Sequence, residues 1–293
     1  MSTMVELLSE LATVDGGAVE SKYAGVRFFK ESRHVRCRPL LYNPGICIVA
    51  SGYKVGHVGD VSFRYDANNY LVTSVVMPVE CESFATESEP LLGLYIDIDI
   101  AQPNLMISQM GMRLDDDLAE EETLLAMGPS MLDDDMRDAA VKLLKALRSD
   151  RETRILVPGL IKEIYYRALC GSQASMLYSL VRGSSVFTQV AQVLSIMEEN
   201  FSDKIDVQLL ATKANMSISS FHKAFKEITA DSPLQYLKKI RLTRAKDLII
   251  QKRMTACLAA TEVGYESPSQ FSREFKRYFG QSPADLKRGI HTA

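Results

Sequence analysis

The sequence predicts an α+β protein in which a small β-barrel or jelly roll is followed by helices and then by an all-helical C-terminal domain. Between about residues 35 and 100, short apolar segments alternate with turn residues, which is typical of closely spaced antiparallel strands. From about residue 103 the apolar residues recur at helical intervals. The C-terminal part repeats one helix-turn-helix pattern at a distance of fifty residues.

Composition is consistent with two packed domains that differ in charge. The chain has 293 residues and is 46% hydrophobic, which is enough for a core in each domain. Residues 201–293 hold 16 Lys and Arg against 9 Asp and Glu, whereas residues 1–200 hold 18 against 28. A basic part joined to an acidic part is typical of a DNA-contacting module attached to a domain that does not touch DNA. Solvation of the surface alone is the alternative interpretation.

Several features argue against secretion and membrane insertion. The five cysteines are scattered and show no metal-type spacing, so reduced thiols in a cytoplasm are expected. The N-terminus lacks a basic flank followed by an apolar core, so no signal peptide is predicted. No apolar run approaches the roughly 20 residues that a membrane span needs. We therefore expect a cytoplasmic protein without a membrane partner.

The predicted N-terminal domain covers residues 1–183, with the barrel at about 20–102 and helices at about 103–183. One of these helices carries an apolar stripe that requires a partner surface. Two interpretations stay open, namely packing within the chain or contact in a homodimer. The dimer candidates on the stripe are Leu143, Leu144 and Leu147. The Gly-Ser segment at residues 182–185 is the expected connection to the next domain.

The predicted C-terminal domain covers residues 184–293 and contains two helix-turn-helix units, at about 190–231 and 251–288. A helix over 233–250 joins them, and about 18 residues at roughly 1.5 Å each make it about 27 Å long. The two recognition helices can therefore lie about one DNA turn, roughly 34 Å, apart. The paired positions are Ser217 with Ser267, Phe221 with Phe271, and Phe225 with Phe275.

Local signals place the start of each recognition helix. Ser217 and Ser267 are expected N-caps, and Ile218 is expected on the buried face of the first helix. In the second unit, Pro268 fits the first helical position and Gln270 completes a predicted capping box. A helix that is buried on one side and polar on the other has the form that fits a major groove.

Residues 190–290 resemble the DNA-binding domain of the AraC/XylS family. The matching segments are MSxSxFHKxFK at 216–226, SPLQYLKxIRLxxAKxLI at 232–249 and VGYESPSQFSREFKRYFGQSP at 263–283. By position, the resemblance implies double-stranded promoter DNA as a partner and base-reading roles for Ser219, His222, Lys223, Pro268, Ser269, Gln270 and Arg273. We assign phosphate contacts, which position a protein without reading sequence, to Ser217, Lys226, Ser267, Lys276 and Arg277.

The sequence departs from this family pattern at a few positions. Ala230 stands where the second unit has Gly280, which predicts a strained or differently shaped turn. Leu258 occupies a commonly polar position and indicates contact with another domain or with RNA polymerase. Ser219 is small, so the first helix is expected to read fewer bases. For His222, a surface histidine without a DNA role is the alternative interpretation.

The N-terminal two hundred residues resemble the sensor region of a subset of this family, a cupin-like barrel followed by dimerisation helices. That resemblance implies a homodimer that responds to a small-molecule effector and regulates transcription, and we expect an activator that works with RNA polymerase. Cys81 is the effector candidate, because a thiol inside the barrel can react with an electrophile such as an aldehyde or quinone. A buried structural cysteine is the other interpretation.

Two other functions are alternatives to this one. A cupin enzyme needs about three histidines and a carboxylate around a metal ion. The chain has four histidines, of which His34 and His57 lie outside the C-terminal domain, and it has no HxH pair. We therefore expect no enzyme, no metal and no cofactor. The remaining alternative is a regulator whose N-terminal domain only dimerises or docks a protein partner.

Overall fold

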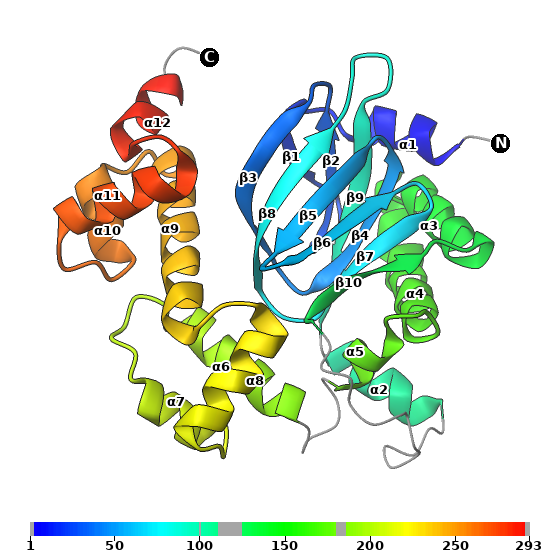
Figure 1. Cartoon of the computed structure of the whole chain (residues 1–293). Helices are drawn as coiled ribbons and strands as arrows, with labels where there is room; N and C mark the ends of the chain where they lie inside the picture. Colours follow the sequence, from blue (N-terminus) through cyan, green and yellow to red (C-terminus); the bar gives the residue numbers. More distant parts are fainter. Residues whose placement is uncertain (1–2, 100, 111–124, 180–185, 291–293) are drawn as a thin grey trace.

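The computed structural model describes residues 3–99, 101–110, 125–179 and 186–290. A β-domain lies in the centre, with helices against one side and the helical C-terminal domain on the other side (Figure 1). The α+β class predicted from the sequence is confirmed. The expected connection at residues 182–185 lies outside the described residues.

The β-domain consists of two antiparallel sheets. The six-stranded sheet has the order β1-β2-β9-β4-β7-β10, and the four-stranded sheet has the order β3-β8-β5-β6. The strands are β1 (Gly17–Glu20), β2 (Val26–Glu31), β3 (Val35–Tyr42), β4 (Gly45–Ser51), β5 (Tyr53–Val58), β6 (Val61–Asp66), β7 (Asn69–Thr73), β8 (Met77–Phe84), β9 (Leu91–Asp97) and β10 (Met127–Met131).

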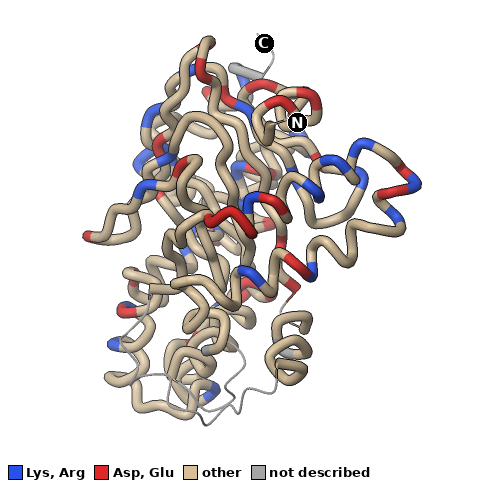
Figure 2. Tube along the Cα trace, turned by 90° about the vertical axis from the view of Figure 1, so that its right-hand side faces the viewer, with Lys and Arg blue, Asp and Glu red and all other residues tan. Residues whose placement is uncertain are grey.

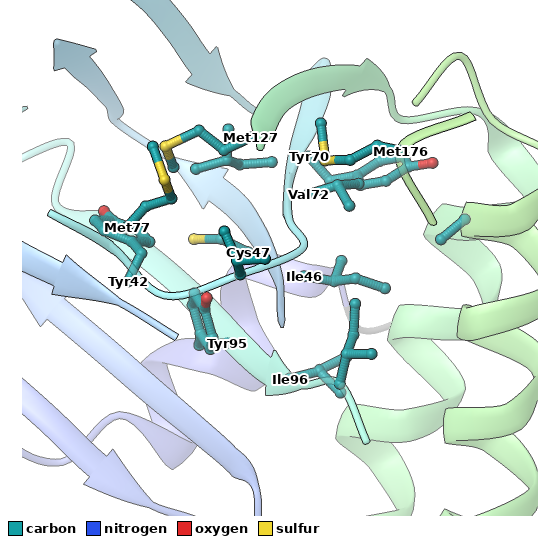
Figure 3. Close-up of a cluster of buried hydrophobic side chains, with 14 of the residues drawn as sticks. Tyr42, Ile46, Cys47, Tyr70, Val72, Met77, Tyr95, Ile96, Met127 and Met176 are labelled. Carbon is teal, nitrogen blue, oxygen red and sulfur yellow. The ribbon is translucent and has the colours of Figure 1, made fainter. Parts of the chain in front are cut away.

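The six-stranded sheet is buried on both faces, because the second sheet covers one face and helices cover the other. Cys47 and Tyr95 point toward Met77 of the four-stranded sheet, whereas Ile46 and Ile96 point toward the helices (Figure 3). Side chains that alternate between two covered faces explain why β4 and β9 consist of almost uninterrupted apolar residues.

The helices fall into two groups along the chain. Those of the N-terminal half are α1 (Met4–Leu11), α2 (Ala101–Gln109), α3 (Asp134–Ala146), α4 (Asp150–Leu169) and α5 (Ala174–Ser179). Those of the C-terminal domain are α6 (Val186–Glu199), α7 (Val207–Lys213), α8 (Ile218–Thr229), α9 (Pro233–Gln251), α10 (Ala256–Glu262), α11 (Pro268–Phe279) and α12 (Pro283–Ile290). We call α7 with α8 the first unit and α10 with α11 the second unit.

The β-domain extends beyond the predicted limits of about 20–102. Strand β10 pairs with β7, with Met127 opposite Thr73 and Met131 opposite Asn69. Its sequence, MGPSM, has no β-branched or aromatic residue and no alternation, so the pattern gave no strand signal. Pro129 is tolerated there because β10 is an edge strand.

The apolar stripe on α3 packs within the chain, and this corrects its assignment as a dimer contact. Leu143, Leu144 and Leu147 are 0%, 0% and 1% exposed, because α3 lies against α1 and α4. A residue already covered in the single chain offers no surface to a second copy. On this side of the molecule, acidic and basic residues lie close to each other (Figure 2).

Candidate DNA interface

The first unit has the predicted cap and core. The Ser217 hydroxyl accepts a hydrogen bond from the Ser220 backbone N–H at 3.2 Å, which fixes the start of α8. Phe221 and Phe225 are fully buried and their rings meet edge to face. Ile218 is 45% exposed, so its predicted burial was wrong: it occupies the first helical position, ahead of the packed face.

The second unit has the same cap but only half of the predicted capping box. Ser267 accepts the Gln270 backbone N–H at 3.3 Å. The Gln270 side chain, however, donates to the Glu274 carboxylate at 3.2 Å and therefore points along the helix. Phe271 and Phe275 form the buried face, as expected.

The turns of the two units use left-handed backbone at corresponding places. Asn215 has φ 52° between α7 and α8, and Gly264 has φ 82° between α10 and α11. At the ends of the recognition helices, Ala230 has φ 59° and Gly280 has φ 75°. The predicted strain at Ala230 is therefore present, because the turn has the same shape but its Cβ atom disfavours this conformation.

The predicted DNA-contacting side chains lie on the outer faces of α8 and α11. All of them are exposed except Ser267, which is partly buried as the N-cap. Lys223 lies 3.9 Å from Glu227 in a solvated pair, and such a pair holds a lysine only weakly. Lys276 and Arg277 lie in the last turn of α11, where the helix dipole favours positive charge. The structure thus presents both sets of side chains outward, and their roles on DNA stay predictions.

Helix α9 connects the units and holds the loops around them. It has 19 residues, which at roughly 1.5 Å each make it about 28 Å long. Arg241 in its middle donates to the backbone carbonyls of Phe201 at 2.6 Å, Gly264 at 3.2 Å and Asp203 at 2.8 Å. Burial lowers the pKa of its guanidinium. This role of Arg241 was not predicted from the sequence, although an arginine between the buried Ile240 and Leu242 was a signal.

The first unit and the N-terminal half of α9 are also joined to the β-domain. The Tyr236 hydroxyl donates to the Val76 carbonyl at 2.6 Å in a buried hydrogen bond. The Ala126 N–H donates to the carbonyl of Ile228, near the end of α8, at 3.1 Å. These bonds satisfy backbone groups that a helix end and a strand end would otherwise leave unpaired. The recognition helix of the first unit is thereby held against the β-domain.

Cys81 lies in the packed interior of the β-domain. It is 1% exposed, and its sulfur lies 3.5 Å from the Tyr65 hydroxyl and 3.7 Å from the Tyr42 hydroxyl. The Lys54 ammonium donates to the Tyr42 hydroxyl at 3.1 Å. The thiol therefore points inward among phenols, and reaction with an electrophile would require entry into this core.

The described residues offer no metal site and no membrane span. Within them, no group of three His, Cys, Asp or Glu side chains is placed to hold an ion. His34 is bound to Glu82 at 2.7 Å, and His57 is bound to Ser62 at 2.8 Å. No helix in this part of the chain combines the length and the apolar character needed to cross a bilayer.

Two helix-turn-helix units on one connecting helix, attached to a β-domain, define a DNA-binding regulator. A family model of the AraC-type transcriptional regulator N-terminus matches residues 22–176, and a helix-turn-helix domain model matches residues 210–289. The chain therefore belongs to the AraC-type transcriptional regulators.

Individual relatives match about a third of this chain, whereas a solved structure matches most of its fold. The chain is 32% identical over 101 residues to the regulator GbdR of Pseudomonas aeruginosa, covering 34% of this chain and 28% of GbdR. It is 28% identical over 97 residues to the transcriptional activator RhaS of Escherichia coli, covering 33% of this chain and 35% of RhaS. The chain thus matches only about a third of these relatives.

The fold resembles that of ToxT from Vibrio cholerae, solved with a bound unsaturated fatty acid. The TM-score is 0.58 at 11% identity, and the match covers 92% of this chain and 96% of ToxT. At this identity the likeness shows a common fold.

Proposed function

We propose that this protein regulates transcription by binding specific double-stranded promoter sequences as a homodimer in the cytoplasm. It responds to a small-molecule effector and acts with RNA polymerase as an activator. The observation that supports this most is the pair of outward polar faces on α8 and α11, held by one connecting helix. The relative RhaS, a transcriptional activator, supports activation over repression.

Sequencing the DNA fragments that crosslink to the protein in its native cells tests this proposal. We expect discrete peaks beside promoters, with a shared motif of two half-elements about one turn apart. Diffuse coverage without a motif would contradict sequence-specific binding. The recovered site then serves as the ligand for two matched variants.

The variants Arg273→Ala and Lys276→Ala separate base reading from phosphate contact on α11. Arg273→Ala should weaken binding to the native site by about 1 to 3 kcal/mol and relax the preference at one base position. Lys276→Ala should weaken all sequences alike and lower the salt slope by about 1. If Arg273→Ala has the same effect on random DNA, Arg273 is a phosphate contact.

We infer that effector binding shifts the population of domain arrangements that fit DNA. ToxT, which shares the fold, has been solved with a bound small molecule, and this supports an effector for the present chain. Cys81 remains the candidate residue for reaction with an electrophilic effector, although its burial favours a structural role. An unchanged response of Cys81→Ser to every electrophile would exclude the reactive role. If no small molecule altered DNA binding, the N-terminal domain would be a dimeriser or a docking site.

The outer face of α4 is the surface that we propose for the dimer contact. Ile155, Leu156 and Tyr166 are 74%, 49% and 42% exposed, and Gly159 between them has open space around its Cβ position. Exposed apolar side chains beside a bare glycine suit close approach of a second helix. Ile155→Glu should shift sedimentation toward the monomer, whereas Val61→Glu, at another exposed apolar position, should not.

A further inference from the structure

The segment that leads into the first unit lies directly against the turn of the second unit. This segment, residues 200–206, joins α6 to α7. A Cβ atom on Gly264 would lie 2.0 Å from the Ser202 carbonyl oxygen and 2.7 Å from its carbonyl carbon. Only a glycine allows another backbone to approach this closely. Gly264 therefore has a second role besides its positive φ, namely contact with the chain that enters the first unit.

Arg241 of α9 ties these two segments to each other. Each of its three guanidinium nitrogens donates to a backbone carbonyl, Nε to Phe201 at 2.6 Å, Nη2 to Asp203 at 2.8 Å and Nη1 to Gly264 at 3.2 Å. Two of these carbonyls belong to the segment before α7, and the third belongs to the turn before α11. A planar guanidinium with fixed donor directions holds its acceptors in one geometry.

Phe201 adds an apolar contact at the same place. It is partly buried and packs both against the core that includes the first unit and against the core of the second unit. A ring buried between two bodies stabilises their contact. We call Phe201, Ser202, Asp203, Arg241 and Gly264 the bridge between the units.

The bridge restricts a motion that the connecting helix leaves open. Helix α9 runs from the first unit to the second and fixes the distance between them, but a unit can still turn about its contact with the helix (Figure 1). Asp203 lies three residues before the N-cap of α7, and Gly264 lies three residues before the N-cap of α11. Helix α7 in turn packs against the recognition helix α8. Anchors so close to the starts of both helices oppose such a rotation.

We propose that Arg241 is a positioning residue that fixes the rotation of α11 relative to α8, and so restricts the spacing of the half-elements that one chain binds. The inference rests on the proposed sequence-specific DNA binding and adds a determinant of site geometry. One base pair inserted between the half-elements moves the second one by about 3.4 Å along the DNA and by about 35° around it. A unit held by the bridge cannot follow this rotation without breaking hydrogen bonds to Arg241.

Binding of the full-length protein to the recovered promoter site tests this role. The duplexes are the native site, the same site with one base pair inserted between its half-elements, and a duplex with a single half-element. The unsubstituted protein should bind the inserted site at least about tenfold more weakly than the native site, because one unit loses its base contacts. Equal binding to these two sites would overturn the inference, since the protein would then impose no fixed spacing.

Arg241→Gln should relax this spacing preference. The variant lacks the forked donors, so the inserted site should bind within about threefold of the native site. Binding to the single half-element should stay within about twofold of that of the unsubstituted protein, because neither base-reading face is altered. Arg241→Lys keeps the charge but not the three directed donors, and it should give an intermediate ratio. If Arg241→Gln does not fold, this second variant decides, and an unchanged ratio would overturn the inference.

Lys238→Gln is the matched control, because it removes one positive charge from α9 outside the bridge. It should keep the preference for the native spacing, whatever its effect on affinity. An Arg241→Gln protein that keeps the full preference would overturn the inference. An equal loss on all three duplexes would also overturn it, since that result indicates a destabilised fold. Loss of specific binding in the unsubstituted protein would instead reject the proposed function.

Discussion

The two helix-turn-helix units repeat the same residues at the same positions, but their cores differ. Phe221 and Phe225 of the first unit belong to a core that continues into the β-domain. Phe271 and Phe275 of the second unit form a separate core with the C-terminal half of α9. One sequence pattern therefore builds one local structure in two different surroundings. The first unit shares its core with the β-domain, whereas the second unit has a core of its own.

The contacts that the two units make with the β-domain also differ in kind. The first unit accepts a hydrogen bond from the Ala126 N–H at the Ile228 carbonyl, and the adjoining start of α9 donates the buried bond from Tyr236 to Val76. Helix α11 of the second unit and the adjoining part of α9 approach β3, where burial and the charge of Arg38 both lower the pKa of Lys246 in α9. Two like charges near a domain contact oppose it. The β-domain thus holds the first unit more firmly than the second.

The largest effect expected is that of truncating matched phenylalanines. Phe225→Ala and Phe275→Ala should each cost about 3 to 5 kcal/mol, because both rings are fully buried. Phe225→Ala should also increase amide hydrogen exchange in the β-domain, since the core is shared. Phe275→Ala should increase exchange only in the second unit. If both variants raised amide exchange in the β-domain equally, this would contradict the separation of the two cores.

A second test uses the contact between Gly59 and the end of α8. A Cβ on Gly59 would lie 2.7 Å from the Ala230 Cβ, and Gly59 has φ 57°. Gly59→Ala should therefore cost about 2 to 3 kcal/mol of unfolding free energy from overlap and backbone strain. In an Ala230→Gly background the overlap disappears, so the cost should fall to about 1 kcal/mol.

The control for this cycle lies in the second unit. Gly280 has φ 75° and nothing within 4 Å of its Cβ position. Gly280→Ala should cost about 1 kcal/mol from strain alone. The same cost for Gly59→Ala in both backgrounds would show that the first unit does not rest on the β-domain in solution.

A smaller effect is expected when tyrosine hydroxyls are removed. Tyr236→Phe should cost about 1 to 2 kcal/mol, because the Val76 carbonyl would be left buried without its donor. Tyr265→Phe should cost less, since its partner Glu274 is only partly buried and can be solvated. Thermal unfolding, followed separately in the β-domain and in the C-terminal domain, distinguishes the two variants. Tyr236→Phe should uncouple the two transitions, and Tyr265→Phe should leave them coupled.

Local patterns predicted the parts of this molecule that depend on neighbours in sequence. The caps at Ser217 and Ser267 and the buried phenylalanines follow from residue type and helical spacing. Strand β10 was missed, because its pairing with β7 joins segments more than fifty residues apart. The stripe at Leu143 indicated that a partner surface exists but did not say which one. The carbonyls bound by Arg241 come together only in the folded chain.

The smallest effect expected concerns the third helical position of each recognition helix. Gln270 and Ser220 occupy this position, and in both units the cap depends on a serine hydroxyl that accepts their backbone N–H. Gln270→Ala and Ser220→Ala should therefore each change the unfolding free energy by less than about 0.5 kcal/mol, whereas Ser267→Ala should cost about 1 kcal/mol. Chemical denaturation of the full chain measures all three.

The substitution Gln270→Ala also separates folding from DNA recognition in the second unit. If Gln270 reads a base, Gln270→Ala should weaken binding to the native site by about 1 to 3 kcal/mol while stability stays unchanged. A stability loss as large as that of Ser267→Ala would mean that the glutamine returns to the cap backbone in solution. It would then be held by the cap rather than by Glu274, and the second unit would begin with a feature that the first unit, with Ser220, cannot form.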